Sequence, residues 1–371
     1  MDSDRKIRVL HVGLDTRLGG IETYLLKISS NIDRERFEFS FLAYDDEKPC
    51  FYDELLSLGC RFYFVRSRRT SFHGNRKDIW SLYRRERFDI VHFHLNSLTY
   101  ITPITEAVRY GIPVIAHSRN AGASAGSSSK LLCAINSIIF PYSKVTLVAV
   151  SGKAGEWMFG KKRKFLVLNN GLDTSRYVFS IEKRIRMRSS LGICDSADVV
   201  IHTGAFREQK NHRFLISVFD EYHRKHGNAV LLLVGSGELM DEVKRDVYAR
   251  GLTDCVLFLG QRSDLPDLLS AADRFLFPSF YEGFPNALLE AEASGLRCVV
   301  SDTITKEACL ENSTSLSLSA PVSEWVEALE KQAPENRESY AGNVERHGFG
   351  IKREMERLEK LYYTLSGRTD G

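Results

Sequence analysis

Short runs of apolar residues alternate with longer amphipathic segments over nearly the whole chain. In the first half, the runs that we predict as strands are Ile7–Val12, Phe37–Ala43, Arg61–Val65, Ile90–His94, Val114–His117 and Val145–Val150. In the second half they are Val199–Thr203, Val230–Val234, Val256–Leu259, Arg274–Phe277 and Arg297–Ser301. Apolar strands separated by helical segments are typical of a parallel sheet with helices on both faces. The pattern therefore predicts an α/β protein with two doubly wound, Rossmann-like domains.

A turn-rich segment, Asn169–Val178, follows a last short strand at Phe165–Leu168 and marks the expected domain boundary. We assign residues 1–175 to the first domain and residues 176–348 to the second. The tail, residues 349–371, has apolar positions at helical spacing, so we expect a helix that packs back on the first domain. The stretch Gly122–Ser129 consists only of Gly, Ser and Ala, and we expect it to be a flexible loop.

Composition agrees with two ordinary globular domains, because 371 residues at roughly 150 residues per domain give about two. The net charge of +3 hides an asymmetry between the halves. Residues 1–178 hold 27 Lys and Arg against 18 Asp and Glu, whereas the remainder holds 24 against 30. A basic half of this kind indicates contact with an anionic partner.

The seven cysteines show no CxxC or metal-ligand spacing, so we expect reduced thiols in a cytoplasmic protein and no metal site. No signal peptide is visible at the N-terminus. The longest membrane-like stretch, Leu131–Phe140, is half of the roughly twenty residues that a spanning helix needs. We therefore expect a soluble chain, attached at most to the inner face of the cell membrane.

Three loops at the predicted carboxyl ends of strands carry residues suited to binding an anion or a sugar. Gly19 and Gly20 open a helix, where backbone amides and the helix dipole favour an anion. Arg207 and Lys210 follow the strand Val199–Thr203, where open α/β sheets bind ligands. The alternatives are an ordinary glycine-rich turn and a solvated basic loop.

The third loop follows the strand Arg274–Phe277. Glu282 precedes a helix that we expect to start near Pro285, and Glu290 lies more than one turn inside that helix. Two carboxylates so placed can bind different hydroxyl groups of one ligand, whereas the alternative for Glu290 is a surface glutamate. His117 ends a buried run, and such a histidine is more often structural than functional.

Together these segments resemble glycosyltransferase family 4, the retaining nucleotide-sugar transferases of the GT-B fold. The resemblance covers almost the whole chain and is nearest to bacterial enzymes of capsule, exopolysaccharide and lipopolysaccharide assembly. The segments that carry it are Gly19–Glu22, Phe88–His94, Val114–Ser118, Ala149–Gly160, Asn169–Tyr177, Gly204–His212, Leu231–Leu239, Val256–Asp273 and Phe277–Leu296. The last contains the family's two glutamates, spaced as E-x7-E, at Glu282 and Glu290. The resemblance implies two domains that face a cleft.

The resemblance also implies roles for individual residues. Gly19 and Gly20 would line the donor diphosphate, and Lys210 would bind its phosphates, with Arg207 able to assist. Glu290 would bind the ribose and Glu282 the transferred sugar. The remaining positions implied near the donor are Gly283, Phe284 and Asn286 through backbone contacts and Arg262 beside the base. His117 would approach the sugar and help the reaction at the donor carbon, so the implied catalytic residues are His117, Glu282 and Lys210.

The implied reaction is the retaining transfer of a sugar from a UDP-hexose or UDP-N-acetylhexosamine to a lipid-linked or growing glycan. Positive charge from Lys210 and helix-end amides can stabilise the leaving diphosphate, so no metal or other cofactor is expected. Two alternatives remain: a non-hydrolysing sugar-nucleotide epimerase and a catalytically weak nucleotide-sugar-binding subunit. The second is suggested by Ala205, where the family usually has arginine.

The basic half acquires a candidate meaning from the same resemblance, because the first domain of the family receives the acceptor, often a polyprenyl-diphosphate-linked sugar. Residues 61–87 hold nine Lys and Arg against two acidic residues, interleaved with aromatic side chains. Such a segment suits an anionic membrane surface, although a solvated charged face is the alternative. No nucleic-acid-binding motif accompanies the charge, so we expect no nucleic-acid partner.

Overall fold

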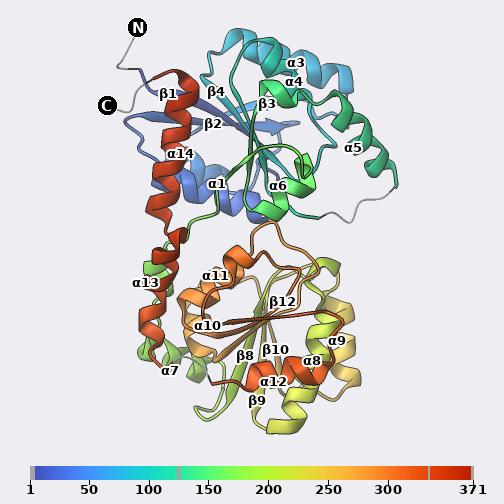
Figure 1. The fold of residues 1–371 in the computed structure, drawn as a ribbon, viewed down its shortest axis with the longest axis vertical. Helices are drawn as coiled ribbons and strands as arrows, with labels where there is room; N and C mark the ends of the chain where they lie inside the picture. Colours follow the sequence, from blue (N-terminus) through green and yellow to red (C-terminus); the bar gives the residue numbers. More distant parts are fainter. Residues whose placement is uncertain (1–4, 123–126, 333–334, 369–371) are drawn as a thin grey trace. The chain divides into compact units, whose positions relative to one another are not determined.

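The computed structural model describes residues 5–122, 127–332 and 335–368. The chain divides into two compact units (Figure 1). The first comprises residues 1–170 together with 352–371, and the second comprises residues 171–351. The chain thus leaves the first unit once and returns to it through its last helix.

The first unit contains a seven-stranded parallel sheet in the order β3-β2-β1-β4-β5-β6-β7. Its strands are β1 (Ile7–Val12), β2 (Phe37–Tyr44), β3 (Arg61–Val65), β4 (Ile90–Leu95), β5 (Val114–Ser118), β6 (Thr146–Ala149) and β7 (Leu166–Val167). Its helices are α1 (Gly20–Asn31), α2 (Tyr52–Ser57), α3 (Phe72–Arg85), α4 (Thr102–Arg109), α5 (Ser127–Ile139), α6 (Gly152–Phe159) and α14 (Ile351–Ser366). The strand order reverses between β1 and β4, and such a point leaves a crevice at the carboxyl ends of the strands.

The second unit repeats this plan with six parallel strands in the order β10-β9-β8-β11-β12-β13. Its strands are β8 (Asp198–Thr203), β9 (Ala229–Val234), β10 (Val256–Gly260), β11 (Arg274–Phe277), β12 (Arg297–Ser301) and β13 (Ser313–Leu316). Its helices are α7 (Ile181–Ser190), α8 (His212–His226), α9 (Met240–Ala249), α10 (Leu265–Ala271), α11 (Asn286–Ala293), α12 (Val322–Glu330) and α13 (Tyr340–Val344). The reversal here lies between β8 and β11.

The apolar pattern predicted the strands within one or two residues, with one omission. The edge strand β13 reads Ser-Thr-Ser-Leu, so it has no apolar run to reveal it. The prediction of a loop over Gly122–Ser129 is wrong for Ser127–Ser129, which form the first turn of α5. Residues 123–126 of that predicted loop lie outside the described part.

Helix α14 packs in the first unit through apolar and charged contacts. The buried Tyr362 ring lies 5.8 Å from that of Phe37 and 6.1 Å from that of Phe39, measured between centroids. Lys27 Nζ of α1 lies 2.7 Å from Glu354 Oε2. The predicted tail helix therefore forms with its apolar stripe covered. Among the described residues, no helix is long and apolar enough to cross a bilayer.

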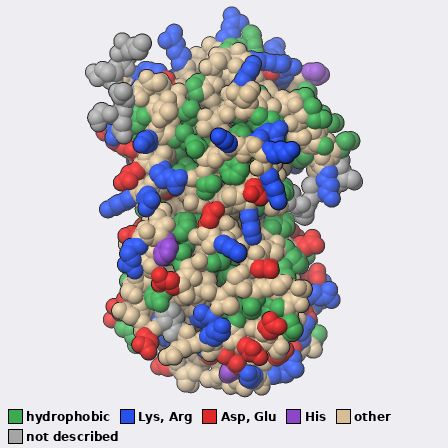
Figure 2. Space-filling view, viewed as in Figure 1, with side chains coloured by type: hydrophobic (Ala, Val, Ile, Leu, Met, Phe, Trp, Pro, Cys, Tyr) green, Lys and Arg blue, Asp and Glu red, His purple; other side chains and the backbone are tan. Residues whose placement is uncertain are grey.

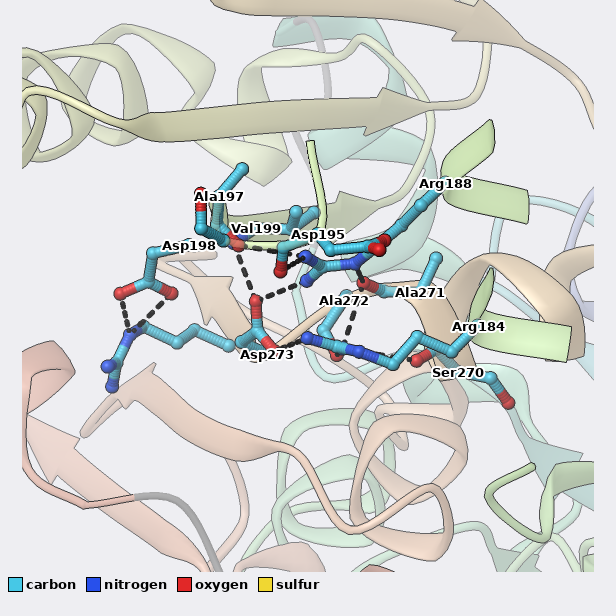
Figure 3. Close-up of polar contacts among 12 residues, drawn as sticks. Arg184, Arg188, Asp195, Ala197, Asp198, Val199, Ser270, Ala271, Ala272 and Asp273 are labelled. Carbon is cyan, nitrogen blue, oxygen red and sulfur yellow. Dashed lines mark hydrogen bonds and ion pairs between the residues drawn. The ribbon is translucent and has the colours of Figure 1, made fainter. Parts of the chain in front are cut away.

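A network of buried charges closes the amino edge of the second sheet (Figure 3). Asp273, just before β11, accepts from Arg184 and Arg188 of α7, each at 2.7 Å, and from the amide of Val199 at 2.8 Å. The guanidinium of Arg188 is 1% exposed. It also donates to the backbone carbonyls of Asp195, Ala197 and Ala271 at 2.8 to 2.9 Å. A buried guanidinium is tolerated when its donors are satisfied, as they are here.

Candidate active site

Three loops meet at the carboxyl edge of the second sheet, after β8, β9 and β11. The side chain of Gln209 donates to the carbonyl of Tyr281 at 2.8 Å, and the amide of Phe280 donates to the carbonyl of Gln209 at 2.8 Å. Asn211, in the left-handed conformation just before α8, donates to the carbonyl of Pro278. The loop after β8 is therefore fixed to the loop after β11, so Lys210 and Glu282 are brought together although 72 positions separate them.

Lys210 and Glu282 form an ion pair at this edge. Lys210 Nζ lies 2.8 Å from Glu282 Oε1, and the two side chains are 15% and 10% exposed. The ammonium group also lies 4.4 Å from the ring centroid of Phe277. The stem of Lys210 passes directly over Gly204, where a Cβ atom would meet the lysine Cε at 2.9 Å. The glycine thus permits the path by which the lysine reaches Glu282.

The loop after β9 packs against this arrangement through two glycines. A Cβ atom at Gly235 would lie 2.1 Å from the carbonyl oxygen of Gly204, and one at Gly237 would collide with the backbone of Phe206. This close approach places Ser236 and Glu238 beside the loop after β8, since the amide of Phe206 donates to the Ser236 carbonyl at 3.0 Å. Neither residue is among the candidate site residues from the sequence, although the Gly-Ser-Gly sequence after a strand was the available signal.

The predicted helix carrying the second glutamate is α11, which begins at Asn286 after the buried Glu282 and Gly283. Glu290 lies one turn inside it and is half-buried. Its carboxylate hydrogen-bonds with the hydroxyl of Tyr177; burial first, and this carboxylate second, raise the pKa of that phenol. Phe284 is 7% exposed and packs 5.5 Å from the ring of Phe349. Glu282 thus lies before the first turn of α11, and Glu290 lies after it.

The two predicted arginines lie on exposed loops of the second unit. Arg207 is 54% exposed, and its Nε lies 3.9 Å from Glu238. Arg262, after β10, makes two hydrogen bonds with Asp264 at 2.6 and 2.8 Å. The same carboxylate raises the pKa of the Arg262 guanidinium. Neither arginine is ion-paired with Glu282, whose partner is Lys210.

In the first unit, Gly19 and Gly20 lie where predicted, at the start of α1. The carboxylate of Glu22 folds back onto this helix end and accepts from the amides of Asp15 and Gly19. Burial raises the pKa of Glu22, and these backbone hydrogen bonds oppose the rise. The protein's own carboxylate thus occupies part of the predicted anion site. A glutamate three residues after the helix cap is the capping-box signal for it.

A cavity of about 300 Å³ opens beside α1 at the carboxyl ends of β1, β2 and β4. Its polar lining includes Asp15, Thr16, Glu47, Asn96, Ser97 and Thr99. Tyr44 and Tyr100 supply aromatic walls. Hydroxyl, amide and carboxylate groups around an aromatic wall suit a polyhydroxylated ligand.

His117 ends β5 as predicted, but its imidazole is fully buried and both nitrogens are engaged. Arg119 Nη1 lies 3.2 Å from His117 Nε2, and His92 Nε2 lies 3.0 Å from His117 Nδ1. Because a guanidinium can only donate, His117 Nε2 accepts and Nδ1 carries the proton. His117 Nδ1 therefore donates a hydrogen bond to His92 Nε2. His92 then carries its own proton on Nδ1 and donates it to the hydroxyl of Tyr362 at 2.8 Å. Burial, with the Arg119 charge adding to it, holds the pKa of His117 well below its usual range.

Three buried histidines beside this chain of hydrogen bonds come nearest to a metal site in the described part of the structure. His11, His92 and His94 each bring one ring nitrogen within 4.8 Å of the others. His92, however, uses its two nitrogens for Tyr362 and His117, and His11 Nδ1 lies 3.2 Å from His94 Nε2. Hydrogen bonds thus engage four of the six ring nitrogens, whereas His11 Nε2 and His94 Nδ1 are buried without a hydrogen-bond partner among the described residues.

Two family profiles match the chain. Glycosyltransferase Family 4 matches residues 18–176, and Glycosyl transferases group 1 matches residues 197–333. EpsF of Bacillus subtilis (strain 168), named as a glycosyltransferase, is 32% identical over 91% of this chain and 90% of EpsF. An Escherichia coli relative, named UDP-Gal:alpha-D-GlcNAc-diphosphoundecaprenol alpha-1,3-galactosyltransferase, is 26% identical and covers 97% of both chains.

Solved structures share the fold at low sequence identity. The Anabaena protein Alr3699/HepE, in complex with UDP and glucose, superimposes with a TM-score of 0.78 at 17% identity, over 96% of this chain and 100% of that one. WaaG, a glycosyltransferase involved in lipopolysaccharide biosynthesis, has a TM-score of 0.69 at 17% identity, over 97% and 100%. These structures show that the fold is of the GT-B class, as predicted. The family profiles and EpsF confirm the predicted transferase activity.

The chain belongs to glycosyltransferase family 4, the family that its motifs resemble. Sugar-nucleotide epimerization, one of the alternatives, is therefore not its activity class.

Proposed function

We propose that this glycosyltransferase moves a sugar from a UDP-sugar to a lipid-linked or growing glycan, with retention of anomeric configuration, in the assembly of a bacterial surface polysaccharide. The observation that carries the proposal is the Lys210–Glu282 pair, fixed at the carboxyl edge of the second sheet immediately before α11. The relatives support the setting: EpsF and the E. coli galactosyltransferase align along nearly the whole chain.

The donor diphosphate lies, in this proposal, against Lys210. Among the described residues, its ammonium makes one hydrogen bond, to Glu282, so two of its three protons remain for phosphate oxygens. The amino end of α11 adds positive potential through its helix dipole. Arg207 reaches the same phosphates by leaving Glu238. The Anabaena neighbour was solved with UDP and with UDP-glucose, which supports a uridine nucleotide.

The two glutamates divide the rest of the donor between them. Glu290 binds the ribose hydroxyls by exchanging its bond to Tyr177 for them, and Arg262 lies beside the base. Glu282 accepts from hydroxyls of the transferred sugar, with Phe284 beside it. A carboxylate bound to Lys210 serves both partners, because it holds the ammonium in place and keeps an oxygen for the sugar.

The chemistry needs no nucleophile from the protein. The acceptor hydroxyl attacks the anomeric carbon on the face from which the diphosphate leaves. A carbon–oxygen bond to the acceptor forms while the bond to the phosphate breaks, and the leaving phosphate oxygen takes the proton. We propose no base role for His117, because its Nε2 accepts from Arg119. The amides and Lys210 stabilise the departing charge, so we propose that no metal ion is required.

The acceptor, on this proposal, enters the cavity of the first unit, where carboxylate, amide and hydroxyl groups line an aromatic wall. The E. coli relative acts on a diphosphoundecaprenol-linked sugar, which supports a lipid-linked acceptor and a location on the inner face of the cell membrane.

The test combines binding with transfer. A thermal-shift screen of nucleotide sugars identifies the donor, because a ligand that binds only the native state raises Tm. Transfer from that donor to bacterial lipid extract is then followed in EDTA, with the linkage configuration read by NMR. Stabilisation without transfer would favour the nucleotide-sugar-binding subunit, and an inverted linkage or loss of activity in EDTA would contradict the mechanism.

A further inference from the structure

Helix α5 turns its apolar side outward. Its apolar residues Leu131, Leu132, Ile135, Ile138 and Ile139 are 64%, 38%, 49%, 83% and 60% exposed. They are spaced i, i+1, i+4, i+7 and i+8, which places them on one face of a helix. The side that packs on the protein is more polar and contains Cys133, Asn136, Ser137 and Phe140. This arrangement is the reverse of an ordinary surface helix, and an apolar patch of this kind marks an interaction surface.

The surroundings of the patch are basic. Residues 107–172 hold nine Lys and Arg and a single acidic residue, Glu156, although Arg109 is ion-paired to Glu106 and Arg119 hydrogen-bonds to His117 and Asn170. Four of the nine, residues 161–164, form an exposed cluster beside the end of α5. Arg163 fixes that cluster in place, since its guanidinium carbon lies 3.7 Å from the ring centroid of Tyr142, three residues after the helix. Hydrophobic side chains gather along the edge of the first unit where α5 runs (Figure 2).

The basic segment of residues 61–87, which we considered from the sequence as the membrane-facing region, is arranged differently. Several of its cations are neutralised by nearby carboxylates: Arg66 Nη2 lies 2.6 Å from Asp78, and Arg76 Nε lies 2.8 Å from Glu106. Its large exposed apolar side chains are fewer, with Phe72 and Trp80 prominent on α3. The combination of a continuous apolar stripe and a basic border is therefore found on α5.

The patch is also connected to the cavity of the first unit. The side chain of Asn136, on the packed side of α5, donates to the backbone carbonyl of Leu98 at 2.6 Å. The neighbouring Ser97 and Thr99 line the cavity. A surface bound to α5 would therefore lie near the cavity proposed for the acceptor.

We propose that α5 lies in the interface of an anionic bilayer, with its five apolar side chains among the acyl-chain ends and residues 161–164 on the headgroups. A helix with these properties binds membranes by apolar burial and by attraction to anionic lipids. The inference extends the proposed function by naming the surface that delivers a lipid-linked acceptor. Vesicle binding can be measured without any transfer, so the two can fail separately.

The experiment is flotation of the full chain with phosphatidylcholine vesicles, with and without phosphatidylglycerol, at low and high salt. The wild type is expected to float with the anionic vesicles at low salt. The double variant Ile138→Gln/Ile139→Gln is expected to bind at least about tenfold more weakly. The matched control is Ile181→Gln/Ile185→Gln on α7 of the second unit, where the isoleucines are 49% and 54% exposed; it should bind as the wild type does.

Two further variants separate the remaining explanations. Lys161→Gln/Lys162→Gln should weaken anionic binding and its salt dependence, whereas Lys77→Gln/Arg84→Gln on α3 should change neither much. Loss of binding in the α3 variant alone would overturn the proposal, as would equal flotation of the wild type and the α5 variant. Sedimentation tests whether a second copy of the chain, rather than a membrane, covers the apolar face of α5. The membrane proposal would also be overturned if the wild type were a dimer and the α5 variant a monomer with unchanged vesicle binding. Tm and nucleotide-sugar stabilisation confirm that each variant is folded.

Discussion

The two edges of the sheet in the second unit both bury charged side chains, but they satisfy them to different degrees. At the amino edge, Arg188 donates to the carboxylate of Asp273 and to three backbone carbonyls at 2.9 Å or less. At the carboxyl edge, Lys210 and Glu282 share one bond of 2.8 Å. The Arg188 cluster stabilises the fold, because its hydrogen-bond donors are satisfied within the protein. A pair with donors to spare can also bind a ligand.

The largest expected effect is on the filled cluster. Arg188→Ala leaves the Asp273 carboxylate and several buried carbonyls short of donors, so we expect the free energy of unfolding to fall by about 3–5 kcal/mol. The matched control is Arg186→Ala on the same helix, where the guanidinium is 66% exposed and contacts Asp267 at 2.6 Å. Exposed pairs contribute little, so that change should stay below about 1 kcal/mol. Urea denaturation measures the free energy of unfolding of both variants. Equal losses would show that the Arg188 cluster stabilises the fold no more than an exposed ion pair does.

The next effect is on the pair with spare donors. Lys210→Ala should lower kcat/KM about 10²–10³-fold, because a group aimed at developing negative charge contributes about that much. The free energy of unfolding should change by only about 1–2 kcal/mol. The control is Lys225→Ala, which removes a more exposed Lys–Glu pair, to Glu330, in the same unit. Initial rates at varied donor concentration measure the effect, and near-normal turnover in Lys210→Ala would remove the phosphate role.

The smallest effect concerns Glu292, a buried carboxyl group that belongs neither to the Arg188 cluster nor to the Lys210–Glu282 pair. Glu292, 1% exposed near the end of α11, accepts from the amide of Leu310 and the hydroxyl of Ser313, and burial raises its pKa to about 8. A raised folded-state pKa gives stability that is full below the unfolded value, near 4.5, and is lost as pH rises toward 8. Between about pH 7 and 9, the wild type should lose roughly 1–2 kcal/mol relative to Glu292→Gln. Urea titrations at the two pH values measure this, and parallel curves for both proteins would contradict it.

The strands and the helix α11 owe much to signals that are local in sequence. Apolar runs predicted nearly every strand, because a buried parallel strand must be apolar on both faces. The strand β13 escaped because it lies at the sheet edge and is built from serine and threonine. The start of helix α11 was predicted because Pro285 suits a first helical turn, and this start places Glu282 outside the helix and Glu290 inside it.

The site depended on contacts that no local pattern contains. The pairing of Lys210 with Glu282 joins loops after β8 and β11. The hydrogen-bonded chain from Arg119 through His117 and His92 to Tyr362 joins two strands to the last helix. The sequence offered His117 as a candidate near the sugar, but only packing fills both of its nitrogens. Likewise, Glu22 competes for the amides of Gly19 because the chain before α1 folds over that helix end.

By itself, the sequence determined the class of fold, the family, and which loops after strands carry the candidate site residues. These follow from apolar periodicity and from motifs of adjacent residues. The tertiary structure decided which charged side chains have their hydrogen-bond donors satisfied within the protein and which keep donors for a ligand. This depends on groups that are far apart in the chain. It also decided which face of α5 is covered. The apolar stretch Leu131–Phe140 is evident in the sequence, but only the packing of Asn136 against Leu98 shows that its isoleucines point outward.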